Sequence, residues 1–347
     1  MPDLDSPSKK GLERSTRTNR KGTGRVSTME KKTVVFALTS SVGLANEIVG
    51  QLGIPLGQCD VKHFSDGEIM VELGESVRGK NVYIVQSTCA PVSSNIMEVL
   101  IAIDACKRAS AAHISVVMPY FGYARQDRKA KARQPITSKL VADLLETAGA
   151  NRVITMELHA TQIQGFFDIP ADDISAIPII GKYFKDLNLS DVVVVSPDHG
   201  GATRARKMSE ALDCPIAIID KRRPKPNVAE VMGIIGDVAG KNCVLIDDMI
   251  DTAGTIVAGA QILKEKGAKD VYIACTHGVL SGPAVDRLKD CVAKEVIITD
   301  TIAIPEEKRF DKLVQISVAE LLAYTIESIE NDLPVSDVFQ HFDFKGE

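Results

Sequence analysis

The chain has 347 residues, of which 45% are hydrophobic and 25% charged, as is typical of a soluble globular protein of about two domains. A formal net charge of -5 argues against non-specific binding to nucleic acid, and no apolar stretch approaches the roughly 20 residues that span a membrane. The seven cysteines are scattered without a C-x-x-C pair, which favours buried thiols in a reducing cytoplasm over disulfides or zinc.

Residues 1–30 differ in kind from the rest of the chain. Basic residues alternate there with Ser, Thr and Gly, and no apolar segment follows, which excludes a secretory signal. We expect a disordered leader. A transit peptide is the alternative, but Asp3, Asp5 and Glu13 weigh against it, so an extension without function is favoured.

From residue 31 onward, apolar runs of strand length alternate with segments of helical periodicity. This alternation predicts a parallel α/β fold. The expected strands are, in chain order, 33–38, 82–86, 114–118, 152–156, 191–195, 216–219, 243–246, 271–275 and 295–299.

The chain also repeats a short pattern. Gly-Lys-Asn at 79–81 and again at 240–242 each precedes an apolar run. We therefore expect two similar α/β halves at 31–170 and 171–330, followed by a C-terminal segment at 331–347. In the register of the repeat, Gln86 and Ser87 take the places of Asp247 and Asp248, so only the second half is expected to keep an acidic site.

The most informative segment is 243–255. Its apolar run is expected to deliver Asp247 and Asp248 into a loop at the rim of the sheet, followed by Asp251, Thr252, Ala253, Gly254 and Thr255. Carboxylates suit the hydroxyls of a ribose, and the N-terminus of a helix starting near Thr255 suits a phosphate. This pattern predicts a sugar-phosphate site. The alternative is an ordinary loop in which Thr252 or Thr255 caps the helix.

Two further candidates follow expected strands. His159 comes after 152–156, and its chemistry alone leaves a structural and a catalytic role equally open. Asp198, in Ser-Pro-Asp-His-Gly-Gly at 196–201, is suited to Mg²⁺ or to a hydroxyl, or else to a simple turn before a helix. Its place on the rim favours a functional role.

A basic loop follows the strand at 216–219. Lys221 and Arg223 lie beside prolines that force an extended conformation, and their charges suit a polyphosphate, although a solvated face is the alternative. No G-x-x-x-x-G-K-[ST] motif is present. The aromatic loop before Arg125 and Gln126 could frame an adenine ring or form an exposed interaction loop. The residues at 64–68 on their own indicate no more than a turn.

Six motifs together resemble the ribose-phosphate pyrophosphokinase family of the phosphate-activated bacterial type. In order they are FSDGE, YARQDRK, LHATQIQGFFDIP, SPDHGG, DKRRP and DDMIDTAGT, and the resemblance covers about 32–340. It implies two phosphoribosyltransferase-type domains, each with a mainly parallel sheet flanked by helices. The implied reaction transfers the β,γ-diphosphoryl group of MgATP to the 1-hydroxyl of ribose 5-phosphate, giving phosphoribosyl pyrophosphate (PRPP) and AMP for nucleotide, His and Trp biosynthesis.

The resemblance also implies roles for individual residues. Lys221 and Arg223 would stabilise the transferring group, while His159 and Asp198 would bind Mg²⁺. Ribose 5-phosphate would be bound by Arg223, Asp247, Asp248, Asp251, Thr252, Ala253, Gly254 and Thr255, and ATP by Arg125, Gln126 and, from a neighbouring subunit, Phe64, Asp66, Gly67 and Glu68. A cytoplasmic homo-oligomer, usually a hexamer, is implied. The resemblance also implies that the chain after about residue 325, including the segment 331–347, packs on the first half.

Two positions depart from the family pattern. Glu157 stands where Asp is usual, which lengthens the arm near His159. Pro334 replaces a hydroxyl residue in the segment that, with Ser336, Ser76 and Arg78, resembles the regulatory phosphate site. Activation by inorganic phosphate and inhibition by ADP are therefore expected in a weakened form.

Three other functions compete with this interpretation. A phosphoribosyltransferase would share the acidic segment but would not need FSDGE or DKRRP. A noncatalytic paralogue should have lost the catalytic side chains, yet Lys221, Arg223, His159 and Asp198 are all present. A PRPP-sensing regulator would have only the short leader as a segment suited to DNA.

Overall fold

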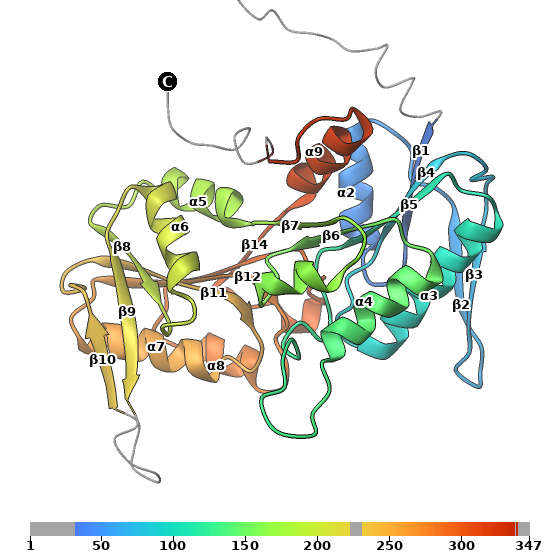
Figure 1. The fold of residues 1–347 in the computed structure, drawn as a ribbon. Coiled ribbons are helices and arrows are strands. Elements are labelled where there is room, and N and C mark those ends of the chain that lie inside the picture. The colour runs from blue at the N-terminus through green and yellow to red at the C-terminus, as the bar shows by residue number, and fades with distance from the viewer. Residues whose placement is uncertain (1–31, 223–230, 337, 339–347) are drawn as a thin grey trace, which may run out of the picture.

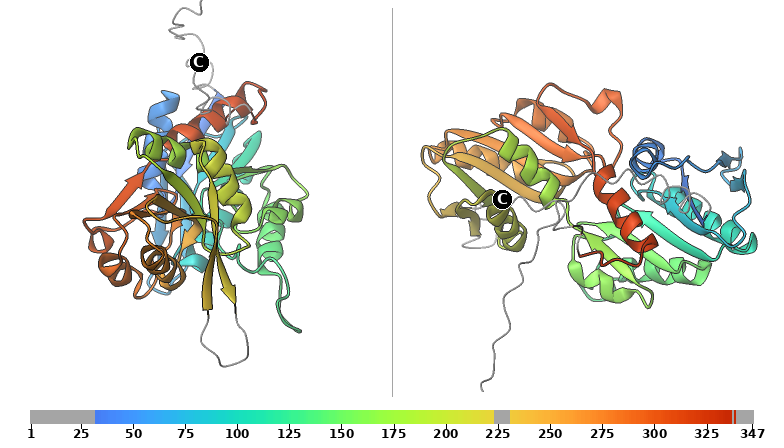
Figure 2. Two further views of the ribbon diagram at one scale, coloured as in Figure 1. Left: turned by 90° about the vertical axis from the view of Figure 1, so that its left-hand side faces the viewer. Right: turned by 90° about the horizontal axis from the view of Figure 1, so that it is seen from above.

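The computed structural model describes residues 32–222, 231–336 and 338; of 221, 222, 231 and 232 it describes the backbone. Two α/β halves lie side by side, each built on a sheet flanked by helices (Figures 1 and 2). This arrangement confirms the expected fold class. Among the described residues, no helix is long and apolar enough to cross a membrane.

The first half is built on a parallel sheet. Within the described residues its strand order is β1 (Thr33–Ala37), β4 (Asn81–Val85), β5 (His113–Met118), β6 (Arg152–Met156) and β7 (Ala171–Ile174). Its helices are α2 (Val42–Leu52), α3 (Val92–Arg108), α4 (Thr137–Ala148) and the short η1 (Thr161–Phe166). An antiparallel hairpin of β2 (Cys59–His63) and β3 (Ile69–Leu73) forms a separate sheet, with β3 packed against α3.

The second half repeats this plan. β8 (Val192–Ser196), β11 (Asn242–Ile250), β12 (Asp270–Gly278), β13 (Glu295–Thr299) and β14 (Leu313–Ile316) pair in parallel in that order. β9 (Ile216–Arg222) pairs in parallel on the other side of β8, and β10 (Val231–Ile235) pairs antiparallel with β9. The helices are α6 (Ala202–Leu212), α7 (Gly254–Glu265), α8 (Ala284–Asp290) and the short η2 (Glu306–Lys308).

The two halves correspond strand by strand. Asn81 pairs with Thr33 at the start of β1, and Asn242 pairs with Val192 at the start of β8, so the repeated Gly-Lys-Asn introduces equivalent strands. The hairpins differ, since β9 and β10 join the sheet of their half whereas β2 and β3 do not. In the second sheet, β8 is followed by β9 on one side, whereas β11 is followed by β12 on the other side. The point between β8 and β11 is therefore a topological switch point, which is where ligands bind in open α/β sheets.

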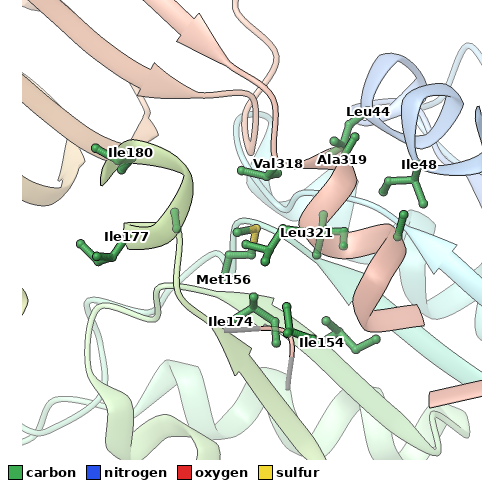
Figure 3. Close-up of a cluster of buried hydrophobic side chains, with 14 of the residues drawn as sticks. Leu44, Ile48, Ile154, Met156, Ile174, Ile177, Ile180, Val318, Ala319 and Leu321 are labelled. Carbon is green, nitrogen blue, oxygen red and sulfur yellow. The ribbon is translucent and has the colours of Figure 1, made fainter. Parts of the chain in front are cut away.

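The halves exchange their last helices. α5 (Ile177–Asp186) follows β7 but packs on α6, and α9 (Ala319–Glu330) follows β14 but packs on α2. Figure 3 shows Ala319 and Leu321 beside Leu44 and Ile48 within one apolar cluster. Figure 2 shows α9 across the junction of the halves. This exchange buries apolar surface from both halves in a common core.

Sheet membership moves the expected boundary at 170/171. β7 pairs with β6, so the first sheet ends at Ile174 and not at residue 170. α9 packs on the first half, as the resemblance implies for the chain after about residue 325, although its residues lie within the range 171–330 that we assigned to the second half. The reason is that strand pairing and helix packing, rather than chain order, decide which half an element stabilises.

Two expected loops are strands. β11 runs through Asp247 and Asp248 to Ile250, because β12 pairs alongside it as far as Gly278. β9 likewise extends past Ile219 to Arg222, because β10 pairs with it. The expected start of a helix near Thr255 is close, since α7 begins at Gly254. Five strands, β2, β3, β7, β10 and β14, are absent from our expectation. β2 (CDVKH) and β7 (ADDI) carry charged residues instead of an apolar run.

Glu330 anchors the exchanged helix α9. Its carboxylate accepts hydrogen bonds from Thr33 Oγ1 (2.7 Å), Asn81 Nδ2 (3.1 Å) and Tyr83 Oη (2.8 Å). We expect Glu330→Ala to lower the free energy of unfolding by about 2 kcal/mol, because three partly buried donors lose their acceptor. Chemical denaturation measures this, with Glu327→Ala on the exposed face of α9 as control. Equal stability of the two variants would contradict the anchoring role.

Candidate active site

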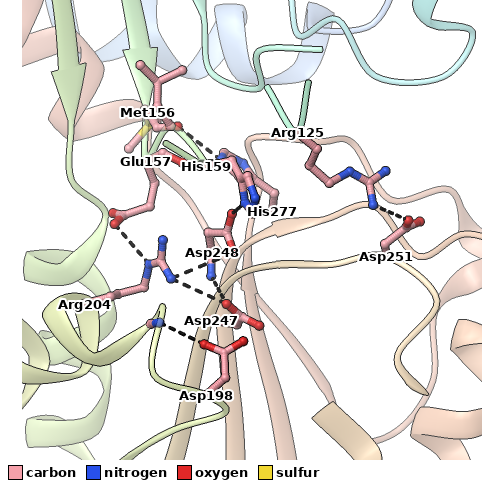
Figure 4. A network of polar contacts seen from close by, with 12 residues as sticks. Arg125, Met156, Glu157, His159, Asp198, Arg204, Asp247, Asp248, Asp251 and His277 are labelled. Carbon is pink, nitrogen blue, oxygen red and sulfur yellow. Dashed lines mark hydrogen bonds and ion pairs between the residues drawn. The ribbon is translucent and has the colours of Figure 1, made fainter. Parts of the chain in front are cut away.

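The candidate site lies where strand ends from both halves meet. β6 of the first half and β8 and β11 of the second half end there (Figure 4). Beside these strand ends lies a cavity of about 760 Å³, whose lining includes residues after β6 and on α6 but not Asp247 or Asp248 of β11. The cavity is lined from the first half by Glu157 and His159 and from α6 by Thr203, Arg204 and Lys207. The site is therefore formed between the halves (Figure 4).

Asp247 and Asp248 place carboxylates at the end of β11. Consecutive strand residues point to opposite faces, so the two side chains have different surroundings. Asp247 is 26% exposed, and its Oδ1 accepts the backbone N–H of Asp248 at 2.9 Å. Asp248 is 6% exposed, and its Oδ2 lies 2.6 Å from Nδ1 of His159. This last contact joins the two halves directly.

Arg204 balances the carboxylates. Its guanidinium lies 3.3 Å from Glu157, 3.4 Å from Asp247 and 3.8 Å from Asp248, and its side chain is 14% exposed. Three carboxylates therefore share this one guanidinium, and of the three Asp248 also contacts the Nδ1 of His159. The group around Arg204 thus has more acidic than basic side chains. Such a surplus favours binding of a further cation.

The acidic pair and its histidine have shifted pKa values. Burial raises the pKa of Asp247, and the neighbouring Asp248 raises it further. Burial also acts to raise the pKa of Asp248, but the hydrogen bond with His159 and the charge of Arg204 outweigh it and hold that pKa below its usual range. The hydrogen bond with Asp248 in turn raises the pKa of His159. Negative charge is therefore concentrated on Asp248.

The loop after β8 carries Asp198. Its Oδ1 accepts the N–H of Gly201 at 3.0 Å, which is the turn contact that the sequence left open. The carboxylate is exposed at the same edge as Asp247 (Figure 4). Next to it, His199 Nε2 lies 3.1 Å from Asp220 Oδ1 at the end of β9. The turn role of Asp198 thus leaves its carboxylate exposed beside Asp247.

The segment from Asp251 to Thr255 joins β11 to α7. Arg125 of the first half forms an ion pair with Asp251 at 2.6 Å. Ala253 precedes the helix with φ of 62°, and no side chain caps it, so neither Thr252 nor Thr255 acts as a cap. Gly254 and Thr255, the first two residues of α7, are exposed. The first amides of α7 therefore stay available to an anion.

Lys221 and Arg223 are placed only in part. The backbone of Lys221 pairs with Met232 in the β9–β10 ladder, so this residue lies in a strand and not in the expected loop. Arg223 lies outside the described residues. Gln126, next to Arg125, accepts a hydrogen bond from Thr137 Oγ1 at 2.6 Å.

The remaining predicted residues lie away from the cavity. Phe64, Asp66, Gly67 and Glu68 form the tip of the β2–β3 hairpin, which lies on the side of the first half that faces away from the second (Figure 1). Ser76, Arg78 and Ser336 are exposed, and within the described part of the chain no hydrogen bond or ion pair joins Ser336 to the other two. The single chain does not assemble these two sets with the site.

The contacts of three residues at the site were not predicted. Glu157 accepts from Ser175 Oγ at 3.0 Å and from the amide of Ala176 at 3.2 Å while its other oxygen meets Arg204, which is a use for the longer arm. Arg204 could have been suspected only as a cation in the helix after 196–201. His277 Nε2 donates to the carbonyl of Met156 on β6 at 3.1 Å, and its Nδ1 lies 2.9 Å from Oγ1 of Thr301. No sequence pattern marks this histidine.

The candidate site offers few ligands for a metal ion. Among the residues that the structure describes, no group of three or more His, Cys, Asp or Glu is arranged to hold one. Mg²⁺ does not require such a group, because it keeps several waters and is held by one or two protein ligands together with substrate phosphates. Asp198 and the histidine at 159 could supply such ligands.

The fold and the site define a protein of two α/β halves with a candidate site between them. The model of the N-terminal domain of ribose phosphate pyrophosphokinase matches residues 33–149, and that of the phosphoribosyl synthetase-associated domain matches 203–340. The chain is 60% identical over 305 residues to the ribose-phosphate pyrophosphokinase of Bacillus caldolyticus, covering 88% of this chain and 97% of that protein.

Two further relatives agree. The ribose-phosphate pyrophosphokinase of Bacillus subtilis is 56% identical over 310 residues, covering 89% of this chain and 98% of that protein. The crystal structure of phosphoribosylpyrophosphate synthetase from Mycobacterium smegmatis superposes with a TM-score of 0.82 at 45% identity, covering 87% and 99% of the two chains. The chain belongs to the ribose-phosphate pyrophosphokinase family.

Proposed function

We propose that this protein transfers the β,γ-diphosphoryl group of MgATP to the 1-hydroxyl of ribose 5-phosphate, forming PRPP and AMP. The observation that carries the proposal is the pair of contacts between the halves, His159 with Asp248 and Arg125 with Asp251. They join residues assigned to the nucleotide and its metal with residues assigned to the sugar phosphate. Two substrates bound at these positions would share one cleft.

Ribose 5-phosphate would bind to the second half. The carboxylates of Asp247 and Asp248 can accept hydrogen bonds from the sugar hydroxyls, and the 5-phosphate suits the exposed amides at the start of α7. The ion pair of Asp251 with Arg125 holds this loop against the first half. Orientation of the 1-hydroxyl is the contribution expected from these residues.

MgATP would bind from the side of the first half. Bound Mg²⁺ would neutralise phosphate charge, with His159 and Asp198 as its protein ligands. Arg125 and Gln126 would contact the nucleotide, and Lys221 and Arg223 would stabilise the charge that develops on the diphosphoryl group. The acidic surplus around Arg204 supports a site that binds a cation together with its anionic substrate.

Oligomerisation would complete the nucleotide site. The hairpin residues Phe64, Asp66, Gly67 and Glu68 lie away from the cavity of their own chain, which supports their use by a neighbouring subunit of a homo-oligomer, which we propose is a hexamer. Inorganic phosphate and ADP are the proposed effectors, acting at Ser76, Arg78 and Ser336 in a cytoplasmic enzyme. Pro334 is expected to weaken their effect.

Product analysis tests the proposed reaction. Assembled protein supplied with ATP, Mg²⁺ and ribose 5-phosphate should release AMP and PRPP in equal amounts, with and without inorganic phosphate. Formation of ADP instead would indicate transfer of a single phosphoryl group. Incubation with PRPP and a purine base is the control for a phosphoribosyltransferase, and we expect it to yield no nucleotide.

A further inference from the structure

The first half buries a carboxylate where the second half has its acidic site. Glu98 on α3 is 1% exposed and accepts hydrogen bonds from the Thr39 amide (3.2 Å) and hydroxyl (2.7 Å) and from Gln86 Nε2 (2.8 Å). A fourth contact, at 3.1 Å, comes from His63 Nε2. A buried carboxylate needs such partners, since an unpaired buried charge is costly.

The internal repeat relates the neighbour of Glu98, Gln86, to the acidic site of the second half. Gln86 occupies the position equivalent to Asp247, and its Oε1 accepts from the amide (3.0 Å) and hydroxyl (2.8 Å) of Ser40 after β1. The ends of β1 and β4 are thus filled by the chain's own polar groups. Within the described residues no buried side-chain nitrogen or oxygen lacks a partner, so this network is closed and is not an empty ligand site.

His63 connects this network to the hairpin. It is the last residue of β2, its side chain is 46% exposed, and the hairpin tip begins with the next residue. An ionised carboxylate can only accept, so Nε2 of His63 donates to Glu98. Beyond it, Phe64 N–H donates to the carbonyl of Glu68 at 2.8 Å and closes the tip. The tip therefore starts one residue past a buried anchor.

The rest of the hairpin is held by apolar contacts. β2 and β3 pair only with each other among the described strands, and β3 packs against α3. Cys59, Val61, Val71 and Leu73 pack against the core of the first half but are only partly buried. The contact of His63 with Glu98 adds a polar contact with a buried group at the base of the tip, where the β2–β3 ladder ends.

We propose that Glu98 is a positioning residue for the nucleotide: through His63 it fixes the β2–β3 hairpin so that the tip at 64–68 can contact ATP. The inference rests on the proposed function, in which this tip binds ATP. The first half has, in effect, converted its copy of the sugar site into a support for the nucleotide-binding loop. Loss of the contact should weaken ATP binding and leave ribose 5-phosphate binding unchanged.

The test replaces the exposed partner, because changing buried Glu98 could prevent folding. We expect His63→Ala to raise the KM for ATP by about tenfold, the typical value of one hydrogen bond to a charged group. KM for ribose 5-phosphate and kcat should stay within about twofold. His63→Gln, whose amide can still donate to Glu98, should restore most of the affinity for ATP.

Lys62→Ala is the matched control, because Lys62 lies on the same strand and pairs with Glu72 inside the hairpin at 3.5 Å. It should keep both KM values. An unchanged KM for ATP in His63→Ala, or an equal rise in both KM values, overturns the positioning role. Absence of AMP release by the unmodified protein would instead overturn the proposed function, so the two failures are distinguishable.

Discussion

Lys221→Ala is expected to lower kcat by about 10²- to 10³-fold while KM for both substrates changes by less than about threefold, the pattern of a group that stabilises developing charge. The physical reason is that diphosphoryl transfer needs positioning and charge neutralisation more than covalent chemistry. Lys221 lies at the end of β9, next to Asp220, whose carboxylate contacts His199 in the loop that carries Asp198. Its backbone is thus at the edge of the candidate site.

Steady-state kinetics measures this effect. Lys241→Ala is the control, because this substitution also removes one positive charge, but from a surface ion pair with Asp237. It should retain full activity. A Lys221→Ala enzyme with normal kcat, or one impaired only in KM, would exclude Lys221 from transition-state stabilisation.

Arg204→Met should destabilise the protein by about 3 kcal/mol at neutral pH, because it leaves buried carboxylates without their cation. Methionine keeps much of the side-chain volume, so lost charge rather than a cavity accounts for the effect. Without Arg204, whose charge lowers the pKa values of Asp247 and Asp248, those two values should rise. A carboxyl group whose pKa is raised in the folded state binds a proton more readily there than in the unfolded state. Lowering the pH therefore stabilises the folded variant, and the loss of stability relative to the unmodified protein should shrink as pH falls.

Denaturation at several pH values measures this difference. Arg206→Met, on the same helix but exposed, is the matched control and should leave stability unchanged. A deficit in Arg204→Met that is the same at pH about 5 and at pH about 8 would indicate a packing defect instead of uncompensated charge.

The central strands and the acidic segment could be predicted from the sequence because their signals are local. Strands covered on both faces, such as β8 and β11, appear as continuous apolar runs, and the Gly-Lys-Asn repeat correctly marked equivalent strands. Placement at the rim of parallel strands then indicated that Asp247 and His159 would lie together, and Asp248 contacts His159.

The rest depended on contacts between distant residues. The partners of Arg204 are 43 to 47 residues away in the chain, and those of Glu330 on β4 are about 250 away, so no local pattern marks them. Each exchanged helix alone has an ordinary amphipathic pattern, so only the resemblance, and no local pattern, implied that the C-terminal helix α9 packs on the first half, and nothing marked the exchange of α5. Strand ends were misplaced because β10 and β12 decide how far β9 and β11 continue.

The origin of the transferred group tests the central claim most directly. The protein would be supplied with ribose 5-phosphate and ATP labelled at the β-phosphorus, and the products separated. If the two substrates face each other across the cleft between the halves, the label should appear in PRPP and AMP should be unlabelled. Label retained in ADP, with a singly phosphorylated sugar position, would contradict attack at the middle phosphorus.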